Sequence, residues 1–219
     1  MELFLLRHFE SEKNVINKMS LKDDEKLTKK GIENCRQFLE NFQILCSTEN
    51  IKITEVNIAN STRAKESAEI ILKQLQNVKV YYWDALKSTK SGNLAGKTLE
   101  DIKEEDPFFH YHYMLYRKGL LNLYYMDENW KDGSKESKKE FEKRVLDCFN
   151  KIINPKKNDE GVLIIAHRAS ITAILIEIAR RSGFYPNDFY GNIQLTLGGL
   201  SWITINNEKI NINYIDKRI

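Results

Sequence analysis

The sequence predicts an α/β protein: a three-layer sandwich with a mostly parallel central sheet, helices on both faces and a helical, aromatic-rich lid insertion. Short apolar runs of strand length, at 3–6 and 162–166, alternate with longer segments of helical periodicity. Such alternation is typical of a sheet that is covered on both faces. The length of 219 residues fits a single domain over 1–219. We expect the lid insertion at about 97–134.

The N-terminal half contains alternating strand and helix patterns. Thr28 is the predicted N-cap of the first long helix, whose inward face carries Cys35, Leu39 and Phe42 at helical spacing. The remaining predicted elements of this half are strands at 3–6, 54–59 and 78–82 and a helix at about 64–74. Residues 83–96 form a predicted loop that contains glycine, serine and lysine.

The C-terminal half begins with a segment dense in aromatic residues, from Phe108 to Trp130, which we interpret as the lid. Gly183 is a predicted helix stop signal. The predicted elements that follow the lid are a helix at about 135–153, a strand at 162–166, a helix at about 170–181, and a strand-like tail over 194–214 with a hairpin turn at Asn206-Asn207.

Composition and charge exclude several classes of protein. The net charge of +3 comes from 34 basic and 31 acidic residues, so the sequence does not predict nucleic-acid binding. The three cysteines are unclustered, which favours free thiols in a reducing compartment. No apolar run approaches the ~20 residues that a bilayer crossing needs. The first core strand begins close to Met1, so we expect no signal peptide, no membrane association and a cytoplasmic location.

Two predicted strands end in a histidine. The run at 3–6 leads into Arg7-His8, and the run at 162–166 leads into His167. Open α/β sheets bind ligands at the carboxyl edge of their strands. An arginine at that edge offers a planar fork of donors to phosphate, and a neutral imidazole can attack phosphorus. Together with Arg63, which follows another strand, these residues predict an anion pocket with a nucleophile.

The ordered set of motifs resembles the histidine phosphatase superfamily, in the branch of cofactor-dependent phosphoglycerate mutases and related phosphatases. The resemblance extends from residue 3 to about 197. It implies that His8 forms a phosphohistidine, that Arg7 and Arg63 bind the phosphoryl oxygens, that His167 donates to the same group, and that Asn14 also reaches the phosphate. It places the aromatic lid over the pocket, where it would shape substrate choice.

The chemistry of phosphoryl transfer agrees with these implied roles. The reaction depends mainly on alignment and on positive charge placed where negative charge accumulates. Two guanidinium groups can supply this without a metal. Their charge also favours the neutral form of His8, which is the form that attacks. Arg63 could instead pair with a carboxylate at the surface, and this alternative stays open.

The sequence departs from the family pattern beside both histidines. Phe9 stands where the family usually has glycine after the first histidine, so it adds bulk beside the nucleophile. Arg168 stands where glycine usually follows the second histidine. It could bind phosphate, and we group it with the substrate-binding residues, or it could face solvent.

A third departure concerns the proton donor. Ser88 stands where the family usually has the glutamate that protonates the leaving oxygen, and a serine hydroxyl is too weak an acid for that task. General acid assistance is worth roughly a hundred- to ten-thousand-fold. We therefore expect poor leaving groups to suffer more than phenols, acyl phosphates or pyrophosphates. Asp84 is the best substitute donor in the sequence, and Glu66 and Glu10 are weaker ones. Ser88 itself would contact the substrate.

Three functions follow from this set of residues. The first is a metal-independent phosphatase without cofactors, acting on a small-molecule phosphoester or a phosphoprotein. The second is a phosphoglycerate-type phosphomutase. The third is a catalytically impaired module that binds phosphorylated ligands. His110 and His112 alternate within the lid, but without a third ligand they do not predict a metal site. A homodimer is left open.

Overall fold

The computed structural model describes residues 1–16, 18–19, 24–90, 92–118, 136–154, 160–183, 193–206 and 209–219. Within these residues a six-stranded sheet has the strand order β3-β2-β4-β1-β5-β6. The strands are β1 (Glu2–Arg7), β2 (Ile53–Ala59), β3 (Lys79–Trp83), β4 (Gly161–Ala166), β5 (Leu200–Asn206) and β6 (Lys209–Lys217). Strands β3, β2, β4 and β1 pair in parallel, whereas the β1–β5 and β5–β6 pairs are antiparallel. The mostly parallel sheet is thus confirmed.

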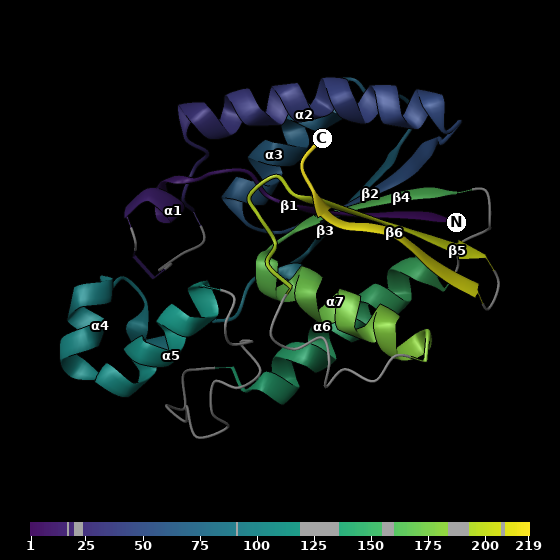
Figure 1. Cartoon of the computed structure of the whole chain (residues 1–219). Coiled ribbons are helices and arrows are strands. Elements are labelled where there is room, and N and C mark those ends of the chain that lie inside the picture. Colours follow the sequence, from purple (N-terminus) through teal and green to yellow (C-terminus); the bar gives the residue numbers. More distant parts are fainter. Residues whose placement is uncertain are drawn as a thin grey trace.

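Helices cover both faces of this sheet. The helical elements are α1 (Glu12–Ile16), α2 (Lys29–Thr48), α3 (Thr62–Leu72), η1 (Asp84–Leu86), η2 (Gly92–Leu94), α4 (Leu99–Glu105), α5 (Pro107–Arg117), α6 (Lys138–Ile153) and α7 (Arg168–Arg181). Helices α2 and α3 lie on one face, and α6 and α7 lie on the other (Figure 1). This confirms the predicted three layers. Among the described helices, none combines the length and the apolarity that a bilayer crossing requires.

The two histidine-ending strands lie side by side at the centre of the sheet. Every residue of β4 is buried, as are the four central residues of β1. Parallel strands with helices on both faces are buried on both sides, and their sequences therefore read as continuous apolar runs. Their side chains join those of α2, α3, α6 and α7 in one hydrophobic core. The strand ends that carry the histidines are consequently attached to the buried core of the fold.

The start of α2 confirms the predicted cap. The Thr28 hydroxyl accepts a hydrogen bond from the backbone nitrogen of Gly31 at 3.0 Å. A side chain at Gly31 would place its Cβ 2.1 Å from the carbonyl oxygen of Glu10. The loop that follows His8 therefore packs directly on the first turn of α2, a contact that only glycine permits.

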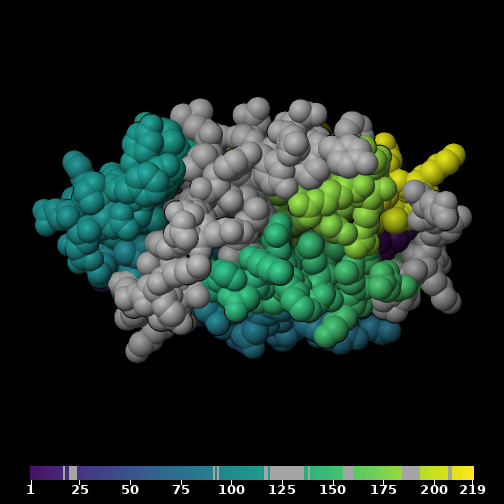
Figure 2. Space-filling view, turned by 90° about the horizontal axis from the view of Figure 1, so that it is seen from below, coloured from purple at the N-terminus to yellow at the C-terminus, as the bar shows by residue number. Residues whose placement is uncertain are grey.

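The described part of the lid forms a small core of its own. Leu99, Ile102 and Phe109 from α4 and α5 are buried together with Met19 and Leu94. These helices lie at one end of the molecule (Figures 1 and 2). Residues 99–105 and 107–117 of the predicted lid are helical, whereas residues 119–135 lie outside the described residues. That the lid covers the pocket stays a prediction.

Several element boundaries differ from the predictions. Helices α3 and α7 begin directly after the strand ends, so Arg63 and Arg168 lie in first turns. Helix α6 begins at Lys138, where Ser137 and Glu140 form a capping box. The final hairpin starts at Leu200, because residues 193–199 turn back along the end of β1 instead of joining the sheet. The predicted turn at Asn206-Asn207 extends into residues outside the described range.

Candidate active site

The carboxyl ends of β1 and β4 bring the two histidines together. Arg7 is paired with Ala166 in the parallel register, and the backbone nitrogen of His8 donates to the carbonyl oxygen of Ala166 at 3.0 Å. The His8 and His167 ring centroids are 5.1 Å apart, with the rings edge to face. Both side chains are buried. The predicted meeting of the two imidazoles is confirmed.

His8 has the protonation pattern of a nucleophile. Its Nδ1 lies 2.7 Å from the carbonyl oxygen of Phe9, which can only accept a hydrogen bond, so Nδ1 carries the proton. In the neutral ring Nε2 then holds an unshared electron pair. Burial lowers the pKa of His8 well below its usual 6.5, and the charges of Arg63 and Arg7 lower it further. The imidazole is therefore neutral at physiological pH.

His167 is held in the opposite tautomer. The Arg63 Nη2 group lies 3.4 Å from Nδ1 of His167 and can only donate, so Nδ1 is the acceptor. Nε2 of the same ring lies 3.1 Å from the Ser61 hydroxyl and carries the proton. Burial lowers the pKa of His167 well below its usual value, and Arg63 and His8 add to the effect. His167 thus presents a neutral N–H donor inside the pocket.

Arg63 connects this histidine to a carboxylate. Its side chain is only 2% exposed, and its Nη1 group lies 2.8 Å from Oε2 of Glu25, whose side chain is 15% exposed. The sequence left open that Arg63 pairs with a carboxylate at the surface. Arg63 does pair with a carboxylate, but the pair lies inside the pocket, so the predicted surface location is wrong. Arg7 donates to the carbonyl oxygen of Leu195, and its charge acts on both histidines. Two guanidiniums and two imidazoles consequently gather in one region, where Arg63 and both histidines are buried and Arg7 is half-buried.

Asn14 and Arg168 lie at the edges of this region. Oδ1 of Asn14 accepts hydrogen bonds from the backbone nitrogen and the hydroxyl of Ser11, at 3.0 and 2.8 Å. These contacts fold the loop after His8, and only the Asn14 amide nitrogen could donate to a phosphate. Arg168 is half-buried at the first position of α7. Phosphate contacts for both residues stay predictions.

Asp84 does not have the surroundings of a proton donor. Its side chain is 75% exposed and lies 2.9 Å from Nζ of Lys87. Nδ2 of Asn60 donates to the same carboxylate at 3.0 Å. Hydrogen bonds from Lys87 and Asn60 lower the pKa of Asp84, whereas a general acid at neutral pH needs a raised pKa. The structure therefore weighs against Asp84 as the substitute donor.

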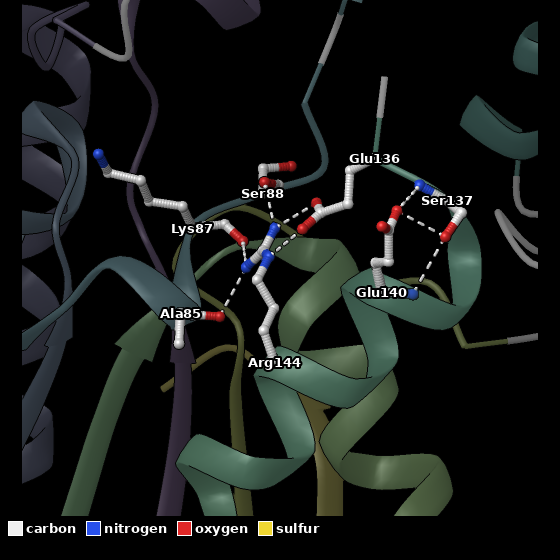
Figure 3. A network of polar contacts seen from close by, with 7 residues as sticks. All are labelled: Ala85, Lys87, Ser88, Glu136, Ser137, Glu140 and Arg144. Atoms are coloured by element: carbon white, nitrogen blue, oxygen red, sulfur yellow. Dashed lines mark hydrogen bonds and ion pairs between the residues drawn. The ribbon is translucent and has the colours of Figure 1, made fainter. Parts of the chain in front are cut away.

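The loop that carries Ser88 is fixed by an arginine–glutamate pair. Arg144 donates from Nη1 to the carbonyl oxygens of Ala85 and Lys87, at 2.6 and 3.0 Å, and from Nη2 to that of Ser88 at 3.0 Å (Figure 3). The other edge of its guanidinium binds both carboxylate oxygens of Glu136, with Nη2 and Oε2 at 2.7 Å. Glu136 is 6% exposed. This arrangement anchors the loop to α6.

Phe9 fills the space beside the nucleophile. Its ring is buried and packs edge to face on Phe38, with centroids 5.6 Å apart. A Cβ at Gly198 would lie 2.4 Å from Cε1 of Phe9. The bulk that replaces the usual glycine is thus accommodated by a glycine from the distant 193–199 segment.

Two pocket residues had no assigned role in the sequence analysis. Glu25 lies in an ordinary polar loop with no motif around it. Ser61 belongs to the segment after β2, and its place directly behind a strand end was a usable signal. Among the described residues, no three His, Cys, Asp or Glu side chains gather in a way that could hold a metal ion.

Comparison with known protein families agrees with this geometry. The sequence profile of the histidine phosphatase superfamily (branch 1) matches residues 3–217. A 2,3-bisphosphoglycerate-dependent phosphoglycerate mutase from Parvibaculum lavamentivorans is 25% identical over 183 residues, which cover 82% of this chain and 80% of that protein.

Solved structures share the fold over nearly their whole length. Bacillus stearothermophilus YhfR has a TM-score of 0.77 at 19% identity, covering 100% of this chain and 97% of that one. The α-ribazole phosphatase from Shigella flexneri has a TM-score of 0.71 at 20% identity, covering 100% and 97%. The mycobacterial glucosyl-3-phosphoglycerate phosphatase has a TM-score of 0.74 at 16% identity, covering 98% of each chain.

Proposed function

The chain belongs to the histidine phosphatase superfamily, and from its pocket we propose that it is a metal-independent phosphatase that hydrolyses phosphomonoesters through a phosphohistidine at His8. One observation carries this proposal: a buried, neutral imidazole with a free Nε2 electron pair lies in the same pocket as His167 and Arg63. A nucleophile and the donors for a phosphoryl group are thus present together.

The proposed first step transfers the phosphoryl group to the enzyme. Nε2 of His8 attacks phosphorus, the Nε2–P bond forms, and the bond from phosphorus to the leaving oxygen breaks. Arg7, Arg63 and the N–H of His167 would bind the phosphoryl oxygens. Because Nδ1 donates to the carbonyl of Phe9, the positive charge that develops on the ring is stabilised by that contact.

The substrate class we propose is a phosphoester with a good leaving group. Ser88 cannot protonate a leaving oxygen, and Asp84 is exposed and bonded to Lys87 and Asn60. The first step then depends on the stability of the departing oxyanion, as in phenyl phosphates, acyl phosphates or pyrophosphates. The proposed substrate is a small molecule that carries such a phosphate group. A phosphoprotein is the alternative substrate.

The serine at position 88 also makes the mutase function less favourable than hydrolysis. A mutase must return the phosphoryl group to a hydroxyl, the reverse of expelling a poor leaving group, so it needs the same acid–base carboxylate. The solved structures that are phosphatases by name favour hydrolysis, whereas the phosphoglycerate mutase relative keeps the mutase as the second candidate. A binding module would retain the pocket without turnover.

The test compares the protein with its His8→Ala variant on p-nitrophenyl phosphate, without added metal. We expect turnover that the variant abolishes, and acid-labile phosphate on the wild-type protein only. Equal rates for the two proteins would refute the proposal. Tight binding of phosphoesters without turnover would instead establish the binding module, and interconversion of 3- and 2-phosphoglycerate would establish the mutase.

A further inference from the structure

Glu25 places a carboxylate in direct contact with Arg63, one of the proposed phosphate-binding groups. Its Oε2 atom lies 2.8 Å from Nη1 of Arg63, while Nη2 of the same guanidinium lies 3.4 Å from His167. Arg63 is almost completely buried, so this contact lies inside the pocket. A phosphoryl group bound to Arg63 would therefore have the Glu25 carboxylate as its neighbour.

Several other carboxylates in the described part of the chain are bonded to groups outside the histidine–arginine cluster. Glu10 accepts from the Thr28 hydroxyl at 2.8 Å, and Glu66 accepts from the backbone nitrogen of Leu27 at 2.6 Å. Glu136 is bound by Arg144, which also holds the carbonyl oxygen of Ser88 (Figure 3). Glu10 and Glu66 both fix the entry to α2, and so they are structural. Asp216, near Arg7, is likewise bonded to the backbone nitrogen of Thr196, at 2.7 Å. Of the described carboxylates named here, Glu25 is the one that contacts Arg63.

We propose that Glu25 is the general base for the second half of the reaction, accepting the proton of the water that hydrolyses the phosphohistidine. This role rests on the proposed function. A carboxylate oxygen can act as a general base by accepting the proton of an attacking water. The hydrogen bond to Arg63 holds the carboxylate beside the guanidinium that would bind the phosphoryl oxygens.

The step is balanced as follows. The oxygen of water attacks phosphorus, and the Nε2–P bond breaks with its electron pair returning to His8. One proton of the water passes to the Glu25 carboxylate, and inorganic phosphate is formed. The proton then leaves Glu25 for solvent. In the first step a good leaving group departs as its oxyanion, so that step does not need Glu25.

The division between the two steps makes the proposal testable with Glu25→Gln. Glutamine keeps an oxygen that can accept from Arg63 but cannot take up a proton. With p-nitrophenyl phosphate we expect a burst of about one equivalent of p-nitrophenol, followed by steady turnover reduced roughly a hundred- to ten-thousand-fold. Phosphorylated His8 should accumulate and be visible by mass spectrometry of the intact variant. Glu25→Asp should restore part of the steady rate.

Matched controls come from neighbouring carboxylates. Asp24→Asn changes an exposed side chain on the same loop, and Glu33→Gln changes an exposed side chain of the adjoining α2. We expect normal steady rates and no accumulated phosphoenzyme for both. A Glu25→Gln variant with wild-type turnover would overturn the inference, and so would one that loses the burst and the steady rate equally, since Glu25 would then only position Arg63. If the wild type neither turns over nor labels His8, the proposed function itself fails.

Discussion

At the scale of single residues, the two pocket histidines have opposite tautomers. A hydrogen-bond acceptor lies beside Nδ1 of His8, whereas a hydrogen-bond donor lies beside Nδ1 of His167. The carbonyl of Phe9 places the proton of His8 on Nδ1, and the guanidinium of Arg63 places the proton of His167 on Nε2. One ring thereby keeps an electron pair for attack, and the other keeps a proton to donate. Protonation of His8 would remove its electron pair, so the lowered pKa of His8 is a functional feature.

These lowered pKa values predict how stability depends on pH. Each histidine has a pKa near 6.5 when unfolded and a lower one when folded. Below pH 6.5 the unfolded chain therefore binds more protons, and the free energy of unfolding falls. The fall should reach about 1.4 kcal/mol per pH unit for each histidine, until the folded-state pKa is reached. Above about pH 7 the contribution is complete. Urea unfolding at several pH values measures this slope.

The variant His8→Gln separates this effect from the titration of carboxylates. It removes one histidine, so the slope between about pH 6.5 and pH 5.5 should decrease by up to about 1.4 kcal/mol per pH unit. An unchanged slope would show that His8 is not held neutral in the folded protein.

Phe9 and Gly198 form a second residue-scale pair. Gly198 has φ +74°, and a Cβ there would collide with the ring of Phe9. We expect Gly198→Ala to lower the free energy of unfolding by about 2–4 kcal/mol, from about 1 kcal/mol of backbone strain plus overpacking. In a Phe9→Ala background the same substitution should cost only the strain of about 1 kcal/mol. A double-mutant cycle by urea unfolding checks this, and additive effects would show that the two sites are independent.

At the scale of elements, α6 and the loop after β3 act as one unit. Arg144 holds three carbonyl oxygens of that loop, and Asp84 at its start binds Asn60, the neighbour of Ser61. Ser61 in turn contacts His167. A continuous set of contacts therefore runs from α6 through the loop to the pocket. The position of the Ser88 loop depends on a helix that has no part in the chemistry.

Removing this guanidinium should affect both stability and activity. Arg144→Ala removes the guanidinium that binds the buried Glu136 carboxylate and three backbone carbonyls. We therefore expect the free energy of unfolding to fall by about 3 kcal/mol. We also expect a reduced kcat/KM on p-nitrophenyl phosphate, which added guanidine at millimolar concentration should partly restore. Lys143→Ala is the matched control, because Lys143 forms an exposed ion pair with Asp147 on the same helix; its effect should stay within about 0.5 kcal/mol. Activity lost without any rescue by guanidine would contradict this role.

The elements differ in how far they could be predicted from the sequence. Strands β1 and β4 are continuous apolar runs because both of their faces are buried, and the histidines at their ends are visible for the same reason. The start of α2 could be predicted at Thr28 because threonine is a preferred N-cap residue, a preference that depends only on the neighbouring residues. Arg144 could not be assigned its partners, because backbone carbonyls occur at every residue. Glu25 reaches Arg63 through loop geometry alone, and the 193–199 segment alternates like a strand although it follows the end of β1.

At the scale of the whole molecule, the pocket exists only when distant segments meet. His8 follows β1, His167 follows β4, Arg63 begins α3 after β2, and Glu25 precedes α2. The sheet order places β1, β4 and β2 next to one another, so their carboxyl ends converge. In the unfolded chain these groups are dispersed between residues 8 and 167. An oxyanion that needs all of them should bind the folded state alone.

This makes stabilisation by orthovanadate a test of the pocket as a whole. A ligand at about a hundred times its Kd that binds only the folded state adds about 2.7 kcal/mol to the free energy of unfolding. We expect the thermal midpoint of the wild type to rise with vanadate concentration, and the rise to vanish in Arg63→Gln. Arg36→Gln, which removes an exposed arginine of α2, should keep the full rise. Equal stabilisation of both variants would mean that vanadate binds outside the histidine pocket, because only Arg63 among the two substituted arginines contacts His167.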